Sequence, residues 1–150
     1  MKDFRWFGSG ELPKYPALGS LDSALMSAWL RNKPSGLQRV AYNVTVGKGR
    51  PADSKSIGYL QEDWKFVTSL RIDAFCEYTN KYEIIELKPD AGANSIGQIL
   101  CYNILMKEEF IPYKPIYMKI VTDSMHPDVL KCCKLLNILV DILPPLSYSG

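Results

Sequence analysis

The amino-acid sequence predicts a mixed α/β domain whose elements follow in the order α-β-β-β-α-β-α. Segments with apolar residues at helical spacing alternate with segments rich in β-branched and aromatic residues. The chain has 150 residues, of which 47% are hydrophobic, so one domain can bury a sizeable core. We therefore expect a single domain over residues 1–150, with a mixed sheet flanked by helices.

The first half of the chain is expected to hold one helix and one complete strand. Residues 1–19 combine aromatic side chains with several Gly and Pro, which predicts an irregular arm. Ser20 can cap a helix over 21–31, where apolar residues recur at helical spacing. Residues 38–46 predict a strand and 47–63 a loop. The side chains expected on one face of that strand are Val40, Tyr42, Val44 and Val46.

The second half is expected to complete the sheet. It predicts strands over 64–78 and 82–88, a helix over 95–109, a strand over 116–122 and a last helix from Pro127. The apolar residues at helical spacing after that proline are Val129, Cys132, Cys133, Leu136 and Val140.

The second and third strands are separated by a short polar break, so we expect a hairpin. A two-residue loop at Thr79-Asn80 places Asp73 opposite Glu86. A loop at Asn80-Lys81 instead places Asp73 opposite Lys88, with Glu86 on the diagonal. In both registers the side-chain period of two puts all three on one face, with opposed Cβ atoms roughly 5 Å apart. A loop of odd length without a bulge would flip one strand and separate them.

This grouping of two acids and a lysine suits metal-assisted chemistry. Opposed carboxylates repel each other, and a divalent cation between them removes that cost. Lys88 could hold an attacking water or neutralise charge that develops on a phosphate. The alternative is a solvated hairpin face on which the acids and the lysine merely pair across the strands.

The helix after the hairpin carries two further polar residues. Asn94 and Ser95 are both suitable N-caps, and we take Ser95 as the start. Gln98 and Tyr102 are four residues apart and share a helix face, which would point toward the acids if the helix packs on the sheet. Alternatively, Gln98 pairs locally and Tyr102 belongs to the core.

The pattern Asp73…Glu86-x-Lys88…Gln98-x-x-x-Tyr102 resembles the PD-(D/E)XK nuclease superfamily, and its helix resembles the RecB-like branch. The superfamily core has the order αβββαβ, which the expected elements match with one added C-terminal helix. The resemblance therefore implies a restriction-endonuclease-like fold.

The resemblance also implies a cofactor and a site. Mg²⁺ or Mn²⁺ would be bound by Asp73, Glu86 and the backbone carbonyl of Leu87. Lys88 would position or activate the attacking water, and the helix pair would shape the site and contact DNA. The residues with implied catalytic roles are Asp73, Glu86, Lys88, Gln98 and Tyr102.

Two departures from the family pattern are visible. Ile72-Asp73 replaces the Pro-Asp dipeptide, and the histidine that RecB-like enzymes carry upstream is missing, because the only histidine is His126. Asp22 is the preferred replacement as a metal ligand, although the helix dipole alone favours an acid in a first turn. All the acids considered for that place are Glu11, Asp22, Asp53, Glu62 and Asp63.

Composition narrows the cellular setting. No apolar run could span a membrane and no signal peptide opens the chain, so we expect a cytoplasmic protein, or one of the host cytoplasm if viral. The net charge is only +2, but Lys48, Arg50 and Lys55 gather in the expected loop and either track phosphates or are simply solvated. Without C-x-x-C spacing, the cysteines are expected to be small core residues: Cys76, Cys101, Cys132 and Cys133.

Three functions remain open on the sequence. The first is a metal-dependent DNA nuclease, exo- or endonucleolytic, that works alone, as a homo-oligomer or as a subunit of a larger DNA-processing partner. The second is a catalytically weak nuclease-fold protein that acts as a DNA-binding or assembly module, which the missing histidine favours. The third is an unrelated small α/β domain in which Glu86-x-Lys88 is coincidental.

Overall fold

The computed structural model describes residues 3–32, 34–50 and 70–144. Within these residues the chain forms six strands and three helices. Their bounds are β1 Trp6–Gly8, α1 Ser20–Arg31, β2 Leu37–Val46, β3 Leu70–Tyr78, β4 Tyr82–Leu87, α3 Ala93–Glu109, β5 Ile116–Thr122, α4 Pro127–Leu135 and β6 Ile138–Ile142. The expected residues 64–69 of the second strand, and most of the expected loop, lie outside the described residues.

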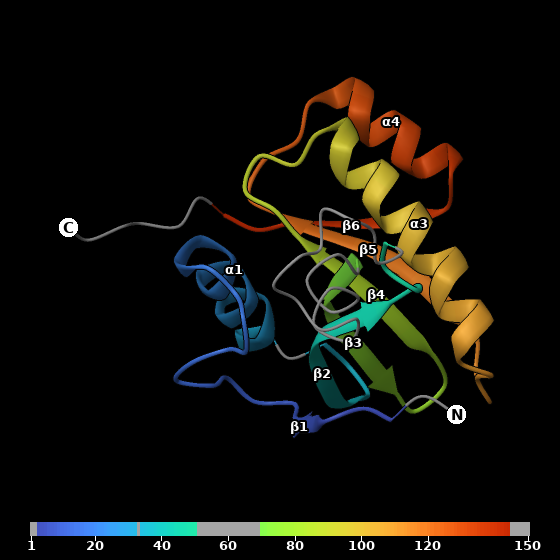
Figure 1. The fold of residues 1–150 in the computed structure, drawn as a ribbon. Helices are drawn as coiled ribbons and strands as arrows, with labels where there is room; N and C mark the ends of the chain where they lie inside the picture. The colour runs from blue at the N-terminus through green and yellow to red at the C-terminus, as the bar shows by residue number, and fades with distance from the viewer. Residues whose placement is uncertain (1–2, 33, 51–69, 145–150) are drawn as a thin grey trace, which may run out of the picture.

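The six strands form one mixed sheet in the order β1-β2-β3-β4-β5-β6. Strands β1 to β4 pair antiparallel, whereas β4, β5 and β6 pair in parallel. Parallel neighbours need a crossover, which α3 and α4 provide. Helix α1 covers one face of the sheet, and α3 and α4 cover the other (Figure 1). We call these the α1 face and the α3 face.

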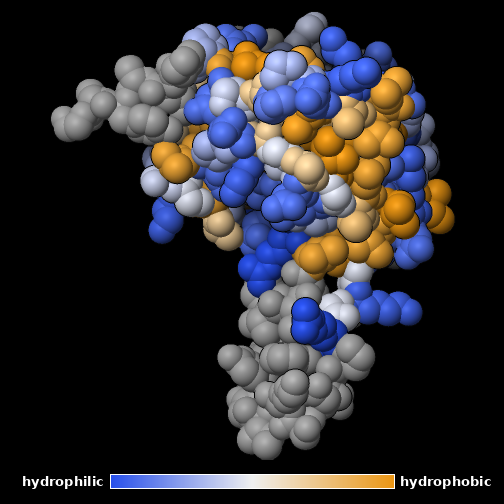
Figure 2. All heavy atoms as spheres, turned by 90° about the horizontal axis from the view of Figure 1, so that it is seen from above, coloured by the Kyte–Doolittle hydropathy of each residue, from blue (hydrophilic) through white to orange (hydrophobic). Residues whose placement is uncertain are grey.

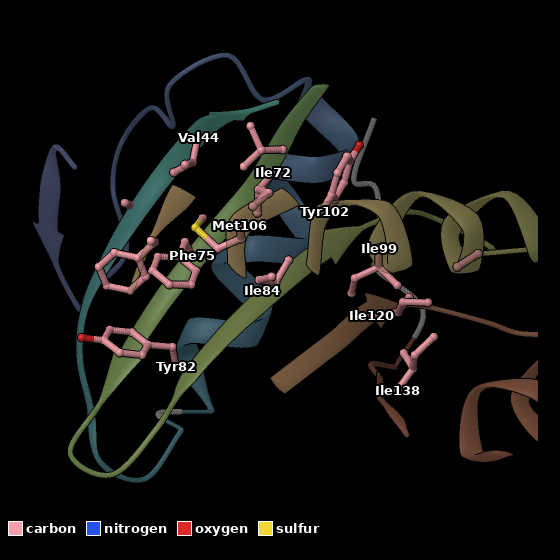
Figure 3. Packing of buried hydrophobic residues seen from close by; sticks show 14 of the residues in the cluster. Val44, Ile72, Phe75, Tyr82, Ile84, Ile99, Tyr102, Met106, Ile120 and Ile138 are labelled. Carbon is pink, nitrogen blue, oxygen red and sulfur yellow. The ribbon is translucent and has the colours of Figure 1, made fainter. Parts of the chain in front are cut away.

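Each face buries its own hydrophobic cluster. On the α1 face, Leu25 and Trp29 pack against Ile85. On the α3 face, Phe75 packs among aromatic rings. Its ring centroid lies 5.2 Å from that of Phe4 and 5.3 Å from that of Tyr82, on which it stacks. The aliphatic residues of this cluster lie between the sheet and α3 (Figure 3). The two clusters fix the sheet between helices and so hold the ends of β3 and β4 in place.

Strand β2 differs from its expected pattern. Val40 and Tyr42 pack in the α1-face cluster, but Val44 and Val46 pack in the α3-face cluster. Asn43, between these pairs, has a φ of 52°, a left-handed conformation that Asn tolerates better than most residues. The expectation that all four side chains share one face was therefore wrong, because period-two counting assumes a continuous extended backbone.

The expected helix caps were displaced by one residue for α1 and by three residues for α3. Gly19 and Gly92 occupy the N-cap positions of α1 and α3 without a side-chain cap, and Ser20 is already helical. Ser95 lies inside the first turn of α3 and is buried. The expected Ser caps were wrong, which reflects how weakly sequence alone fixes a helix end.

Both ends of the chain add strands that were not expected. The arm over 1–19 contains β1, which pairs with β2. The last helix begins at Pro127 as expected but ends at Leu135, and Val140 lies in strand β6. Asn137 has a φ of 57° and turns the chain between them. A short apolar run fits either a buried strand or a helix, which explains the error.

The surface of the α3 face carries exposed apolar side chains. Figure 2 shows hydrophobic residues gathered on one side of this surface, and the exposed apolar residues of α3, α4 and the turn after it include Ile104, Leu135 and Leu136. The four cysteines are free. Cys76 and Cys133 are buried as expected, whereas Cys101 and Cys132 are exposed, so the expectation of core cysteines failed for those two. Within the described ranges, no helix has the length and apolarity required to cross a membrane.

Candidate active site

The register of the β3–β4 hairpin brings two acids face to face. Ala74 pairs with Ile85, and the backbone N–H of Tyr78 donates to the Lys81 carbonyl at 2.8 Å across the turn. The turn is therefore the two-residue loop at Thr79-Asn80. The paired ladder ends at Ala74 and Ile85, and continuing this register by one residue would place Asp73 opposite Glu86. This is the first of the two registers expected from the sequence.

Asp73 and Glu86 lie at the end of the hairpin, largely inside the protein. The backbone N–H of Leu87 donates to Asp73 Oδ2 at 2.9 Å, which fixes the orientation of that carboxyl. Glu86 is only 6% exposed, and its Oε2 atom is buried without a hydrogen-bond partner. A buried carboxyl oxygen without a partner carries a desolvation cost that folding alone does not offset.

The two carboxyl groups perturb each other's ionisation. Burial raises the pKa of Asp73, and the hydrogen bond from Leu87 partly opposes that rise. Burial raises the pKa of Glu86 still further, helped by the charge of Asp73 and by a hydrogen bond between the two side chains in which Glu86 is the protonated partner. Burial and mutual repulsion therefore both disfavour two full negative charges on this pair, as in other closely spaced carboxyl groups.

A third acid and a lysine complete the charges of the site. Asp22 lies in the first turn of α1, and its pKa is raised by burial and lowered by the nearby Lys88 ammonium. The charge of Asp22 raises the pKa of both Asp73 and Glu86, whereas Lys88 lowers them. Helix α1 thus adds a charge to this end of the hairpin.

The three acids interact through their charges but do not form a closed set of ligands. Among residues 3–32, 34–50 and 70–144, no three His, Cys, Asp or Glu side chains are spaced to hold one metal ion together. Two carboxylates with backbone and water oxygens are nevertheless a usual shell for Mg²⁺. The unpartnered Glu86 oxygen and the mutual repulsion of the pair fit a site that a divalent cation would complete.

Backbone geometry directs a further oxygen toward the pair. In an extended strand the N–H and C=O of one residue point to the same side. Because the Leu87 N–H donates to Asp73, the Leu87 carbonyl is directed toward the β3 side as well. The sequence named this carbonyl as a ligand only through the family resemblance.

Helix α3 brings Tyr102 to the acids. Tyr102 is 6% exposed and packs in the α3-face cluster. Burial raises the pKa of its hydroxyl, and the charges of Glu86 and Asp73 raise it further. In Figure 3 the Tyr102 hydroxyl turns away from the packed aliphatic side chains. Tyr102 is therefore both a core residue and a neighbour of the acids, so neither sequence reading was complete.

Gln98 lies beside Tyr102 on the exposed side of α3. The two residues line one hollow of about 420 Å³, together with Leu70 at the start of β3. The other residues of this hollow are Ala93, Asn94, Gly97 and Cys101. From the sequence, Asn94 was expected only as a helix cap and Cys101 only as a core residue, and the other two were not predicted to have a role. The signal that could have found them is the four-residue spacing of the small residues Ala93, Gly97 and Cys101.

The other candidate residues do not join the acids. Glu11 pairs with Arg31 at 3.1 Å, and His126 accepts a hydrogen bond from the Asp128 backbone at the start of α4. Lys48 and Arg50 are exposed at the end of β2. The candidates that lie outside the described residues are Asp53, Lys55, Glu62 and Asp63.

Comparisons with known proteins identify the fold through solved structures. No family model matches the chain, and no curated protein sequence matches it. A repair endonuclease from Pyrococcus abyssi matches 90% of this chain at 15% identity with a TM-score of 0.52. The structure of an EndoMS complex with double-stranded DNA matches 91% at 12% identity with a TM-score of 0.50. A protein of unknown function matches 80% at 16% identity with a TM-score of 0.50.

The chain has a restriction-endonuclease-like fold. The mixed six-stranded sheet with helices on both faces matches these structures over most of its length. This fold contradicts the expectation of an unrelated α/β domain, whereas the role of Glu86-x-Lys88 stays a prediction. The chain spans about half the length of the structures it matches, between 50% and 56%.

Proposed function

We propose that this chain is a metal-dependent DNA nuclease of the PD-(D/E)XK type, with the RecB-like arrangement of its helix pair. The observation that carries the proposal is the Asp73–Glu86 pair, in which Glu86 is 6% exposed and its Oε2 atom is buried without a partner. Such a pair is costly in a protein that has no use for it, and a divalent cation would relieve the cost.

The residues of the hairpin would divide the work of phosphodiester hydrolysis. Asp73, Glu86 and the Leu87 carbonyl would hold Mg²⁺ or Mn²⁺, which when bound supplies Lewis-acid stabilisation of phosphate charge. Lys88 is exposed next to the pair, where its ammonium can orient a water or neutralise the developing charge. Asp22 adds negative charge beside Lys88 and would favour cation binding.

Helix α3 would supply the substrate-positioning groups. The Tyr102 hydroxyl stays protonated beside the acids and can donate a hydrogen bond to a phosphate oxygen. Gln98 lines the adjoining hollow and offers both a donor and an acceptor. DNA is the proposed substrate, and a homo-oligomer or a larger DNA-processing protein is the proposed setting.

Cleavage of DNA by the purified protein tests the proposal. Supercoiled plasmid and linear DNA are incubated with Mg²⁺ or Mn²⁺, with and without EDTA. We expect cleavage that EDTA abolishes and that Asp73→Asn removes, whereas Glu108→Gln, an exposed acid elsewhere on α3, leaves it intact.

The same assay separates the alternative function. A catalytically weak DNA-binding or assembly module is favoured by the missing upstream histidine and by the incomplete set of acid ligands. Binding of DNA without any metal-dependent cleavage would select that module and reject the nuclease.

A further inference from the structure

The hollow beside Tyr102 has the form of a binding site. It has a volume of about 420 Å³, and Leu70 lines it from the start of β3. On α3, Gly97 lies one turn after Ala93 and one turn before Cys101, so small residues form its helical side. A Cβ atom added at Gly97 would meet nothing within 4 Å, so this part of the helix faces open space.

Polar groups stand at the rim of this hollow. Asn94 and Gln98 are four residues apart on α3 and both line it. Each side-chain amide offers donors and an acceptor, as the edge of a nucleobase does. An apolar hollow with amides at its rim fits a planar base that has left its stack.

The position of the hollow links it to the acids and to positive charge. Tyr102 lines the hollow and feels the charges of Asp73 and Glu86. On the other side, Leu70 also lines a second hollow of about 260 Å³, to which Lys48 and Arg50 contribute. A strand whose phosphates follow these two cations would pass the first hollow before it reaches the acids.

We propose that the hollow formed by Leu70, Asn94, Gly97, Cys101 and Tyr102 binds one unpaired nucleobase next to the phosphate that is cleaved. The proposal rests on the proposed nuclease function for its substrate. A base in a duplex is paired and stacked, and its extrusion costs a few kcal/mol. The protein therefore prefers single-stranded DNA, or an unpaired end, over an intact duplex.

Binding measurements without metal test this site independently of cleavage. Fluorescence anisotropy in EDTA compares a labelled single-stranded oligonucleotide with a blunt duplex of the same sequence. The wild-type protein is expected to bind the single strand at least fivefold more tightly, since stacking of one base is worth about 1–3 kcal/mol. Equal affinity for the two, or no binding of the single strand, would overturn the proposal.

Gly97→Leu fills the hollow without a clash in the helix. Leucine has the higher helix propensity, so the thermal midpoint is expected not to fall, while affinity for the single strand drops at least fivefold. Ile104→Leu is the matched control, because Ile104 is exposed on α3 and lines neither hollow. Unchanged single-strand affinity in a folded Gly97→Leu protein would reject the site.

Alkylation of the folded protein provides a second test. Cys101 and Cys132 are exposed, whereas Cys76 and Cys133 are buried. In a Cys132→Ser protein, a bulky maleimide on Cys101 should block the single strand. In a Cys101→Ser protein, the same reagent on Cys132 should leave binding unchanged. Loss in both proteins, or in neither, would contradict the proposal.

The outcomes separate this inference from the nuclease proposal. Metal-dependent cleavage with no effect of Gly97→Leu on binding would remove the base site and keep the nuclease. Single-strand binding that Gly97→Leu weakens, without any cleavage, would keep the base site and remove the nuclease.

Discussion

Strand β4 carries two buried glutamates, Glu83 and Glu86, whose carboxyl groups differ in their partners. Glu83 is fully buried on the α1 face, where Tyr78 donates to it at 2.6 Å and the ammonium groups of Lys81 and Lys119 lie at 3.2 and 3.3 Å. Glu86 is buried beside another acid and has one oxygen without a partner. Lysines of the protein itself compensate the charge of Glu83. For Glu86 we propose that a bound cation does so.

The surroundings of Glu83 form a closed network. Lys119 also pairs with Asp141 at 3.1 Å, and the Trp29 indole N–H donates to Asp141 at 2.8 Å. The network therefore ties α1, β4, β5 and β6 together next to a cavity of about 560 Å³. Lys81, Lys119 and Asp141 line this cavity, so it adjoins charges that are already balanced. We infer that an unbalanced acid, not a cavity, marks the proposed chemistry.

Loss of the proposed metal ligand should have the largest effect. Asp73→Asn removes a carboxylate from the unbalanced pair, so Mn²⁺ binding should be lost and DNA cleavage should fall by roughly 10³-fold or more. Glu83→Gln, measured on folded protein, should keep its Mn²⁺ affinity. Calorimetric titration with Mn²⁺ and initial cleavage rates are the measurements, and unchanged Mn²⁺ affinity in Asp73→Asn would break the comparison.

The same isosteric change should lower stability at Glu83 but not at Glu86. Glu83→Gln leaves the ammonium groups of Lys81 and Lys119 without the carboxylate that is buried between them, and it should cost about 3 kcal/mol of unfolding free energy. Glu86→Gln removes a buried acid that faces another acid and should leave the metal-free protein equally or more stable. Urea unfolding in EDTA compares the two variants, and a loss of similar size in both would contradict our reading.

Lys88 should matter for cleavage more than for metal binding. An ammonium group does not ligate Mg²⁺, but Lys88 lies close enough to both acids to lower their pKa. Lys88→Ala should reduce cleavage by roughly 10²-fold and keep Mn²⁺ affinity within a few-fold. If the variant cuts DNA at nearly the wild-type rate, Lys88 has no part in the reaction.

The stability of the metal-free protein should depend on pH through the ionisation of Glu86. Its folded pKa is raised above that of the unfolded chain, about 4.3. Its contribution to stability is therefore complete below that value and is lost as pH rises through the folded pKa. In EDTA, the unfolding free energy of the Glu86→Gln protein minus that of the wild type should therefore increase as pH rises, by up to about 1.4 kcal/mol per pH unit. A constant difference from pH 5 to 8 would show that Glu86 is not perturbed.

Local rules were enough to set the hairpin register, because the polar break between the strands limits the loop to two residues. The period of two fails at Asp73, since Ile72 and Phe75 both pack in the α3-face cluster whereas Ala74 packs in the α1-face cluster. A shared face for Asp73, Glu86 and Lys88 therefore stays a prediction. The resemblance to a known family implied roles for Lys88, Gln98 and Tyr102. It did not show where these side chains lie relative to the acids.

Features that depend on packing between distant segments were not accessible. Lys119 meets Glu83 only after β5 pairs in parallel with β4, and Asp22 approaches the acids only because α1 packs on the opposite face. The twist at Asn43 and the switch from α4 to β6 at Asn137 depend on single left-handed residues. Nothing in the composition of those segments distinguishes them from continuous elements.

Anomalous diffraction from crystals grown with Mn²⁺ tests the central claim most directly. We expect a Mn²⁺ peak bonded to both Asp73 and Glu86, with the Leu87 carbonyl oxygen in the same shell. We expect no Mn²⁺ at Glu83, whose charge Lys81 and Lys119 already balance. A fully occupied peak elsewhere, or an unchanged hydrogen bond between Asp73 and Glu86 at saturating Mn²⁺, would contradict the proposed metal site.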